Sequence, residues 1–250
     1  MFFDLSRILV SGFRNITPVL LVAVVSLAFN VIEIRCQSGG QNHLSTKATE
    51  QIVVSMSVDV DGAPTSYGPD DAKALDYELN AHVGAKKTGR IVGYLTDSAG
   101  NPVIQTKDDP APGFYVSTTG YYDVKNPRAN DPRRYLDASQ INYTVLADSA
   151  RKLGVKPGDL CVVHSIKKNT TIYGIVGDTG HSSGAEGSLA LLQRLGYAVK
   201  NGKSVDEEIT DIVVRYFAGS NPTQVFYFHQ SDLDKAAKTL HFDTDFSTFH

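Results

Sequence analysis

The chain has no tryptophan and only two cysteines among its 250 residues, Cys36 and Cys161. Two cysteines form at most one bridge, so the chain is not a small scaffold held together by disulfides. Cys161 lies in an apolar stretch, where we expect an unreactive buried thiol. The lack of tryptophan removes the indole ring as a platform for a sugar.

Positive charge is also scarce, because 24 Lys and Arg stand against 27 Asp and Glu, which gives a net charge of -3. This balance argues against nucleic acid as a partner. Neither a CxxC nor an HExxH motif occurs, so we expect no metal and no cofactor. The 42% of hydrophobic residues exclude a disordered chain and favour one large domain, which we expect to be monomeric.

The N-terminal residues have a composition of their own. Arg7 and Arg14 precede an apolar run over 19–29. This order is typical of a secretory signal peptide, with cleavage after Ala28. We therefore expect a secreted, extracellular protein, with a periplasmic location or a membrane tether through residues 17–34 as alternatives.

The residues beyond this segment divide into a tether and a folded domain. Residues 29–50 are rich in Ser, Gly, Gln and Asn, which indicates a flexible linker before a domain over 51–250. β-branched and alternating segments predict short strands over 52–60, 91–95, 103–105, 114–119, 143–146, 160–165, 171–177 and 224–228. Helical spacing predicts a helix over about 188–195 that ends at Gly196. Weaker patterns predict one or two helical turns within 72–81 and helices over 205–214 and 232–240.

Many short strands with few helices between them indicate a mainly-β (α+β) fold. We expect a single closed or nearly closed β-barrel-like domain with a few peripheral helices. A six-stranded barrel of the double-psi type is consistent with the strand count.

The segment 173–191 offers acid–base chemistry. A strand ends at Asp178, a glycine-rich loop follows, and Glu186 stands just ahead of the expected helix. Such a loop can bring two carboxylates to face each other across a sugar and one water. Inverting glycosidases need this pair ~6.5–9.5 Å apart. In the structural alternative, Glu186 complements the helix dipole and Asp178 accepts N–H groups of the turn.

A second segment concentrates negative charge around one turn, with Asp59, Asp61, Asp70 and Asp71 in close succession. These groups would form an acidic wall for a cationic ligand, and their repulsion would raise some of their pKa values. A solvated acidic turn is the alternative.

Aromatic and hydroxyl side chains gather in a third segment, 114–119. Phe114 and Tyr115 point to opposite faces of a strand, so one joins the core and the other can line a groove. In the glycine-rich loop, His181 is placed to tune Asp178, and an exposed loop histidine is the alternative.

Two of the acidic motifs also resemble those of haloacid-dehalogenase-type phosphatases. In that mechanism Asp59 would attack phosphorus, Asp61 would act as acid and base, and Asp178 would help to hold Mg²⁺. The phosphatase fold requires strands that alternate with helices of about 10–15 residues, whereas residues 60–170 are predicted as β-structure rich in Pro and Gly.

These segments together resemble the chitosanases of glycoside hydrolase family 75. The resemblance rests on Asp61-Gly62-Ala63-Pro64 with Tyr67 and Asp70, on 112–119, and above all on Gly177-Asp178-Thr179-Gly180 followed by 184–188. It spans about residues 52–228, and its last segment is the most specific.

The resemblance implies an endo-chitosanase that hydrolyses β-1,4-glucosamine linkages with inversion and needs no cofactor. Asp178 and Glu186 match the catalytic acids of the family, and we expect Glu186 to be the general acid and Asp178 the base. The partner would be chitosan or a related amino-sugar polymer. The expected substrate-binding residues are Asp59, Asp61, Tyr67, Asp70, Tyr115, Thr118, His181 and Ser188. A non-catalytic, exported carbohydrate-binding relative of the same fold is the alternative.

Overall fold

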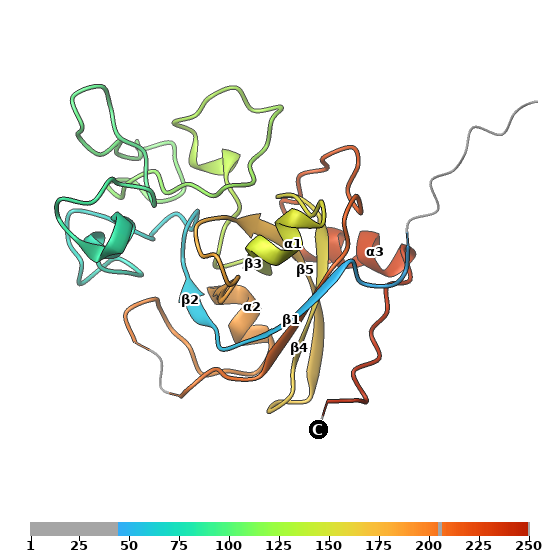
Figure 1. Cartoon of the computed structure of the whole chain (residues 1–250). Helices are drawn as coiled ribbons and strands as arrows, with labels where there is room; N and C mark the ends of the chain where they lie inside the picture. Colours follow the sequence, from blue (N-terminus) through green and yellow to red (C-terminus); the bar gives the residue numbers. More distant parts are fainter. Residues whose placement is uncertain (1–44, 205–206, 250) are drawn as a thin grey trace, which may run out of the picture. The chain divides into compact units, whose positions relative to one another are not determined.

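A computed structural model describes residues 45–204 and 207–249 (Figure 1). The expected signal peptide or anchor over 1–28, most of the tether over 29–50, and Cys36 lie outside these residues. Within the described part of the chain, no helix combines the length and the apolar character that crossing a membrane requires.

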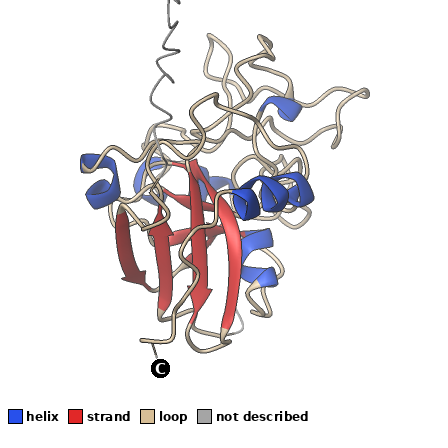
Figure 2. Ribbon diagram, turned by 90° about the vertical axis from the view of Figure 1, so that its right-hand side faces the viewer, coloured by secondary structure: helices blue, strands red, loops and turns tan. Residues whose placement is uncertain are grey.

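Seven strands form one mixed sheet in the order β1-β7-β4-β5-β3-β6-β2. The strands are β1 (Glu50–Val54), β2 (Ser57–Asp59), β3 (Tyr143–Val145), β4 (Leu160–Ser165), β5 (Thr170–Asp178), β6 (Glu186–Ser188) and β7 (Ile212–Tyr216). The pairs β1–β7, β7–β4 and β4–β5 are antiparallel, whereas β3–β5 and β2–β6 are parallel. Figure 2 shows the longer strands side by side, with the loops gathered beyond one end.

The two edge strands are neighbours in sequence. Only Ser55 and Met56 separate β1 at one edge from β2 at the other. Three residue steps span at most about 11 Å, so the sheet must curl until its edges approach each other. The sheet is therefore a curled, barrel-like one, and the predicted mainly-β fold is confirmed at that level.

The central strands are apolar on both sides because both faces of the sheet are buried. In β4, Cys161 and Val163 join one hydrophobic cluster, while Leu160 and Val162 join a second cluster on the opposite face. Burial raises the pKa of the Cys161 thiol to about 12. The prediction of a buried, unreactive cysteine at this position agrees with both observations.

Short helices cover the sheet at α1 (Asp148–Lys152), α2 (Leu189–Arg194) and α3 (Gln230–Thr239). Leucines of α2 pack into the first cluster, and Leu233 and Ala237 of α3 pack into the second. The predicted helix over 188–195 is confirmed, and Gly196 follows it with a φ of 100°, the left-handed conformation that ends many helices.

A predicted helix and a predicted strand are absent from the C-terminal third of the chain. The expected helix over 205–214 is wrong, because Ile212–Tyr216 form the buried strand β7 between β1 and β4. Its β-branched residues suit a central strand better than a helix. Residues 224–228 form no strand, and Gln224 has a φ of 51°. Within 72–81, where one or two helical turns were expected, one 3₁₀ turn forms, η1 (Glu78–Ala81).

The chain between β2 and β3 forms a long layer of loops (Figure 1). Residues 60–142, all described, contain no strand, so the predicted strands over 91–119 appear only as isolated pairs such as Tyr94 with Ser117 and Ile104 with Tyr115. Residues of this layer form a small apolar cluster of their own, which includes Val60, Tyr67 and Tyr94.

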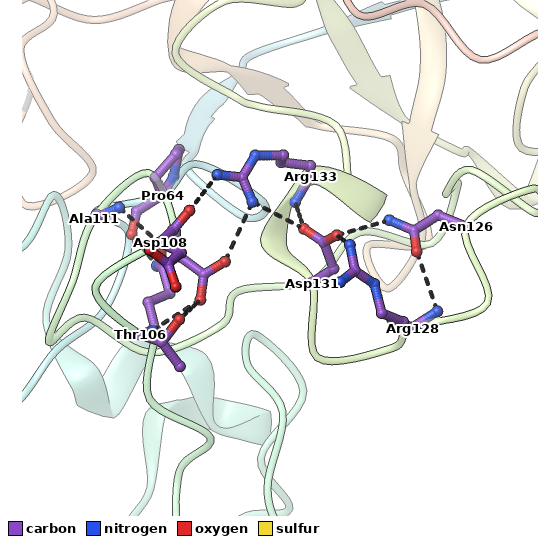
Figure 3. A network of polar contacts seen from close by, with 10 residues as sticks. Pro64, Thr106, Asp108, Ala111, Asn126, Arg128, Asp131 and Arg133 are labelled. Carbon is purple, nitrogen blue, oxygen red and sulfur yellow. Dashed lines mark hydrogen bonds and ion pairs between the residues drawn. The ribbon is translucent and has the colours of Figure 1, made fainter.

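Charged side chains tie separate loops of this layer together (Figure 3). The Arg133 guanidinium contacts the carboxylates of Asp109 at 3.2 Å and Asp131 at 3.4 Å, and it donates to the carbonyl of Asp108 at 2.7 Å. Asp131 also accepts from Arg128. The burial of the Asp131 side chain in this network makes these contacts stronger than ordinary surface ion pairs.

Candidate functional site

A cavity of about 1010 Å³ lies between the sheet and the loop layer. Its charged and polar lining comes from strand ends on one side and from the loops on the other. The lining includes Asp59, Asp61, Tyr67, Asp76, Asn80, His82, Arg90, Tyr94, Thr118, Asp178, Thr179 and Glu186. The cavity thus brings together acids that are more than a hundred residues apart in sequence.

Asp178 is the last residue of β5, and only 8% of it is exposed. Its Oδ1 accepts the backbone N–H groups of Thr179 at 2.6 Å and Gly120 at 2.8 Å. A Cβ at position 120 would lie 3.1 Å from this oxygen, so glycine lets the backbone approach closely. The carboxyl is therefore held in one orientation, with no protein hydrogen bond recorded to Oδ2 among the described residues.

Glu186 begins β6 after the glycine-rich loop. Ser57 of β2 donates its backbone N–H to the carbonyl of Ala185 at 3.0 Å, and Gly184 donates to the carbonyl of His181 at 2.9 Å. These contacts fix the backbone on both sides of the loop end. Glu186 lies two residues before the helix cap Ser188, and it lines the cavity.

Asp59 and Asp61 reach the cavity from β2 and the turn that follows it. Asp59 Oδ1 accepts the backbone N–H of Asp61 at 2.8 Å, and the Tyr67 hydroxyl donates to Asp61 Oδ1 at 2.7 Å. Carboxylate oxygens of Asp59, Asp61 and Asp178 all lie within 4.8 Å of one another. Three such oxygens are a suitable donor set for a hard divalent cation or for shared protons.

Burial raises the pKa values of these acids, and their proximity adds to the rise at the three aspartates. Burial and the charge of Glu186 raise the pKa of Asp59 to about 7. Burial and the charge of Asp59 hold the pKa values of Asp61 and Asp178 well above their usual range, although the N–H groups of Thr179 and Gly120 oppose this at Asp178. Burial also raises the pKa of Glu186. The cluster therefore keeps protons near neutral pH, as acid–base catalysis requires.

Four of the expected substrate-binding residues line this cavity: Asp59, Asp61, Tyr67 and Thr118. The other four lie elsewhere. Asp70 is exposed and contacts Lys73 at 3.5 Å. The ring of Tyr115 packs against Tyr94 at 4.9 Å.

His181 and Ser188 also differ from expectation. His181 is exposed, and its Nδ1 contacts the hydroxyl of Ser183 at 2.9 Å. Ser188 is fully buried, where it donates to the carbonyl of Ile141 at 2.7 Å and accepts from the N–H groups of Tyr143 and Leu191, both at 3.1 Å. Its hydroxyl caps α2 and supports the sheet, which leaves it unable to contact a ligand.

Sequence reasoning missed several of the residues that the loops supply around the site. In η1, Glu78 accepts from His82 Nε2 at 2.7 Å and from the Tyr94 hydroxyl, and His82 Nδ1 contacts the carbonyl of Gly89 at 3.1 Å. The i,i+4 spacing of Glu78 and His82 was the available signal. Asp76, two residues before Glu78, had no motif around it.

No family model matches this chain, and no curated protein matches it.

Proposed function

We propose that this protein is an inverting glycoside hydrolase that cleaves β-1,4-linked glucosamine polymer, with chitosan as its substrate. The observation that carries the proposal is that Asp178 and Glu186 line one cavity together with further acids whose pKa values are raised. Such a cavity can hold one carboxyl protonated and another ionised at the same pH, which is the requirement for this reaction.

The strand order supports the pairing of Asp178 with Glu186. One strand, β3, lies between β5 and β6, and its neighbouring residues Thr144 and Val145 oppose Gly187 and Asp178. Adjacent strands are about 4.8 Å apart, so the backbones at the two acids are separated by roughly 10 Å. Side chains that converge on one cavity from this separation suit the ~6.5–9.5 Å that leaves room for a water molecule.

We assign Asp178 as the base and Glu186 as the acid, as expected from the sequence. Burial and the charge of Asp59 raise the pKa of Asp178, and the two backbone N–H groups that donate to its Oδ1 oppose this rise. In the ionised form of Asp178, Oδ2 can accept a proton from water. Burial raises the pKa of Glu186, which retains the proton that the leaving glycosidic oxygen needs. Water then attacks the anomeric carbon from the face opposite to the departing sugar, and the configuration inverts.

A cationic substrate fits the charge of the cavity. A bound ammonium group would favour the ionised forms of Asp59 and Asp61 beside the proposed catalytic pair, so protonated amines are attracted and added salt weakens the attraction. The proposal includes a secreted location, which the N-terminal composition suggests. It also includes a double-psi form of the barrel, which the parallel pairs β3–β5 and β2–β6 within one curled sheet favour.

The test is the appearance of reducing ends from soluble chitosan with the purified protein, at pH 4 to 8. We expect activity to be highest at mildly acidic pH, and the first product to be the α-anomer by proton NMR. Glu186→Gln and Asp178→Asn should each lower kcat by roughly 10²–10⁴-fold, while the exposed Asp108→Asn retains full activity. Equal activity on uncharged cellulose oligomers, or full activity in Glu186→Gln, would overturn the proposal.

The same experiment separates catalysis from binding alone. A binding-only protein would bind chitosan without releasing reducing ends, and Glu186→Gln would change neither result.

The three clustered oxygens of Asp59, Asp61 and Asp178 favour one second candidate, a Mg²⁺-dependent phosphatase. In its disfavour, the centre of the sheet is antiparallel and few helices separate the strands, whereas that fold alternates strands with helices. Release of phosphate from p-nitrophenyl phosphate that depends on Mg²⁺ and is abolished by Asp59→Asn would support it. No release with Mg²⁺ present would exclude it.

A further inference from the structure

Asp76 is a buried carboxylate on the loop side of the cavity, apart from the cluster at the strand ends. Only 6% of the residue is exposed, and it lines the cavity together with Asn80. Its Oδ1 accepts the backbone N–H of Tyr77 at 2.7 Å and the side-chain amide of Asn80 at 2.8 Å. Among the described residues, no hydrogen bond or ion pair to its Oδ2 is recorded.

The neighbouring cation does not neutralise this oxygen directly. The Lys203 ammonium donates to the backbone carbonyls of Asp71 and Ala74. Burial raises the pKa of Asp76, and the charge of Lys203 only partly opposes this rise. Every buried side-chain nitrogen and oxygen of the described residues has a hydrogen-bond partner, so Oδ2, for which none is recorded, is open to the cavity. A positively charged or hydrogen-donating group in the cavity can therefore reach this oxygen.

Glycine at position 202 lets the backbone pack closely against this carboxylate. A Cβ at position 202 would lie 2.9 Å from both Cγ and Oδ2 of Asp76, and Gly202 itself lines the cavity. Any side chain there would press against Oδ2 and crowd the cavity beside it.

We propose that Asp76, with Asn80 beside it, is the subsite that recognises the protonated amine of an amino sugar bound in this cavity. Asp76 Oδ2 accepts from the ammonium group, and the amide oxygen of Asn80, whose nitrogen is committed to Asp76, accepts from a second N–H or a hydroxyl. This subsite rests on the proposed function, since the ligand is the same polymer.

The subsite gives the cavity a means to select deacetylated units. An N-acetyl group carries no positive charge, so it would leave Asp76 buried without a cation. Sites that hydrogen-bond a substrate group discriminate strongly against analogues that lack it, because their own buried groups are then left unpaired. The acids at the strand ends would carry out the reaction, and Asp76 would determine the selectivity for deacetylated units.

The experiment measures binding in the inactive Glu186→Gln background, by calorimetry with fully deacetylated and fully N-acetylated glucosamine hexamers. Adding Asp76→Asn keeps the shape and an Oδ1 acceptor while it removes the charge. We expect it to weaken the deacetylated hexamer by about 10- to 100-fold, the range of a charge-assisted hydrogen bond, and to leave the acetylated hexamer unchanged. Gly202→Ala should weaken the deacetylated hexamer without any change of charge.

The control is Asp108→Asn, which removes an equal charge from a side chain that is 81% exposed and outside the cavity lining. It should leave both affinities unchanged. Equal affinity of the two hexamers for the background protein, or an Asp76→Asn variant that binds the deacetylated hexamer as tightly as before, would overturn the subsite. If Asp76→Asn bound as tightly as before while the wild-type protein cleaved chitosan, only the subsite would be refuted and the proposed function would remain. Failure of the wild-type protein to cleave chitosan would instead remove the proposed function.

Discussion

Asp59 gives a prediction that does not depend on the proposed reaction. Its folded pKa is raised to about 7 by burial and by Glu186, whereas an aspartate in an unfolded chain titrates near ~3.9. The unfolded chain therefore releases this proton first as pH rises. The contribution of Asp59 to the free energy of unfolding is therefore largest below pH ~3.9, the pKa in the unfolded chain. It falls as the pH rises towards 7 and no longer changes above the folded pKa.

The magnitude follows from the difference between the two pKa values. Roughly three units at 1.36 kcal/mol each correspond to about 4 kcal/mol. Asp59 is only partly buried and keeps contact with cavity water, which reduces this figure, so we expect about 2–4 kcal/mol. Asp59→Asn removes the titration and keeps the oxygen that accepts the N–H of Asp61 at 2.8 Å.

The assay is urea denaturation at pH 4 and pH 8, followed by circular dichroism because the chain has no tryptophan. The gain in unfolding free energy of Asp59→Asn over wild type should be larger at pH 8 than at pH 4 by roughly 2–4 kcal/mol. Asp108→Asn should show no such difference. Parallel pH dependences of wild type and Asp59→Asn would refute the reasoning.

Three further predictions concern single side chains. Ser188→Ala should cost about 3 kcal/mol of unfolding free energy, since it leaves buried N–H groups unpaired at a helix cap; a cost below about 1 kcal/mol by the same assay would contradict the capping role. Tyr67→Phe should move the limb of the activity–pH profile that reports Asp61 upward by about 0.5–1 unit, because the Tyr67 hydroxyl lowers the pKa of Asp61; an unmoved profile would show that Asp61 is not linked to activity. In a Cys36→Ser background, Cys161 should react with a thiol reagent only after unfolding, and rapid labelling of the native protein would disprove its burial.

The strands at the centre of the sheet were predictable because their apolar runs are continuous. Leu160–Ser165 was placed within a residue of its bounds. The error at Ile212–Tyr216 has a physical cause, since a short apolar run fits a buried strand and a buried helix equally well. Its partners, β1 and β4, lie far away in sequence, and only their pairing decides between the two.

The site was most predictable where a motif follows a strand. Asp178 and Asp61 each follow a β-branched run, and the cavity contains both. In the layer without strands, Tyr67 was expected and lines the cavity, whereas Asp76 and His82 were missed.

The path of that layer depends on contacts between distant residues. The ion pair between Arg133 and Asp109, 24 residues apart, is one of them. Neither hydrophobic period nor local spacing encodes such contacts.

The brief connection Ser55–Met56 also protects the molecule from its own edges. A strand edge presents unpaired N–H and C=O groups that invite pairing with other chains. Because this link holds β1 and β2 near each other across the curl, neither edge is presented as a flat, open border. A proteolytic cut or a flexible insertion at this point would let the curl relax and expose both borders, so self-association would be the first sign of damage there.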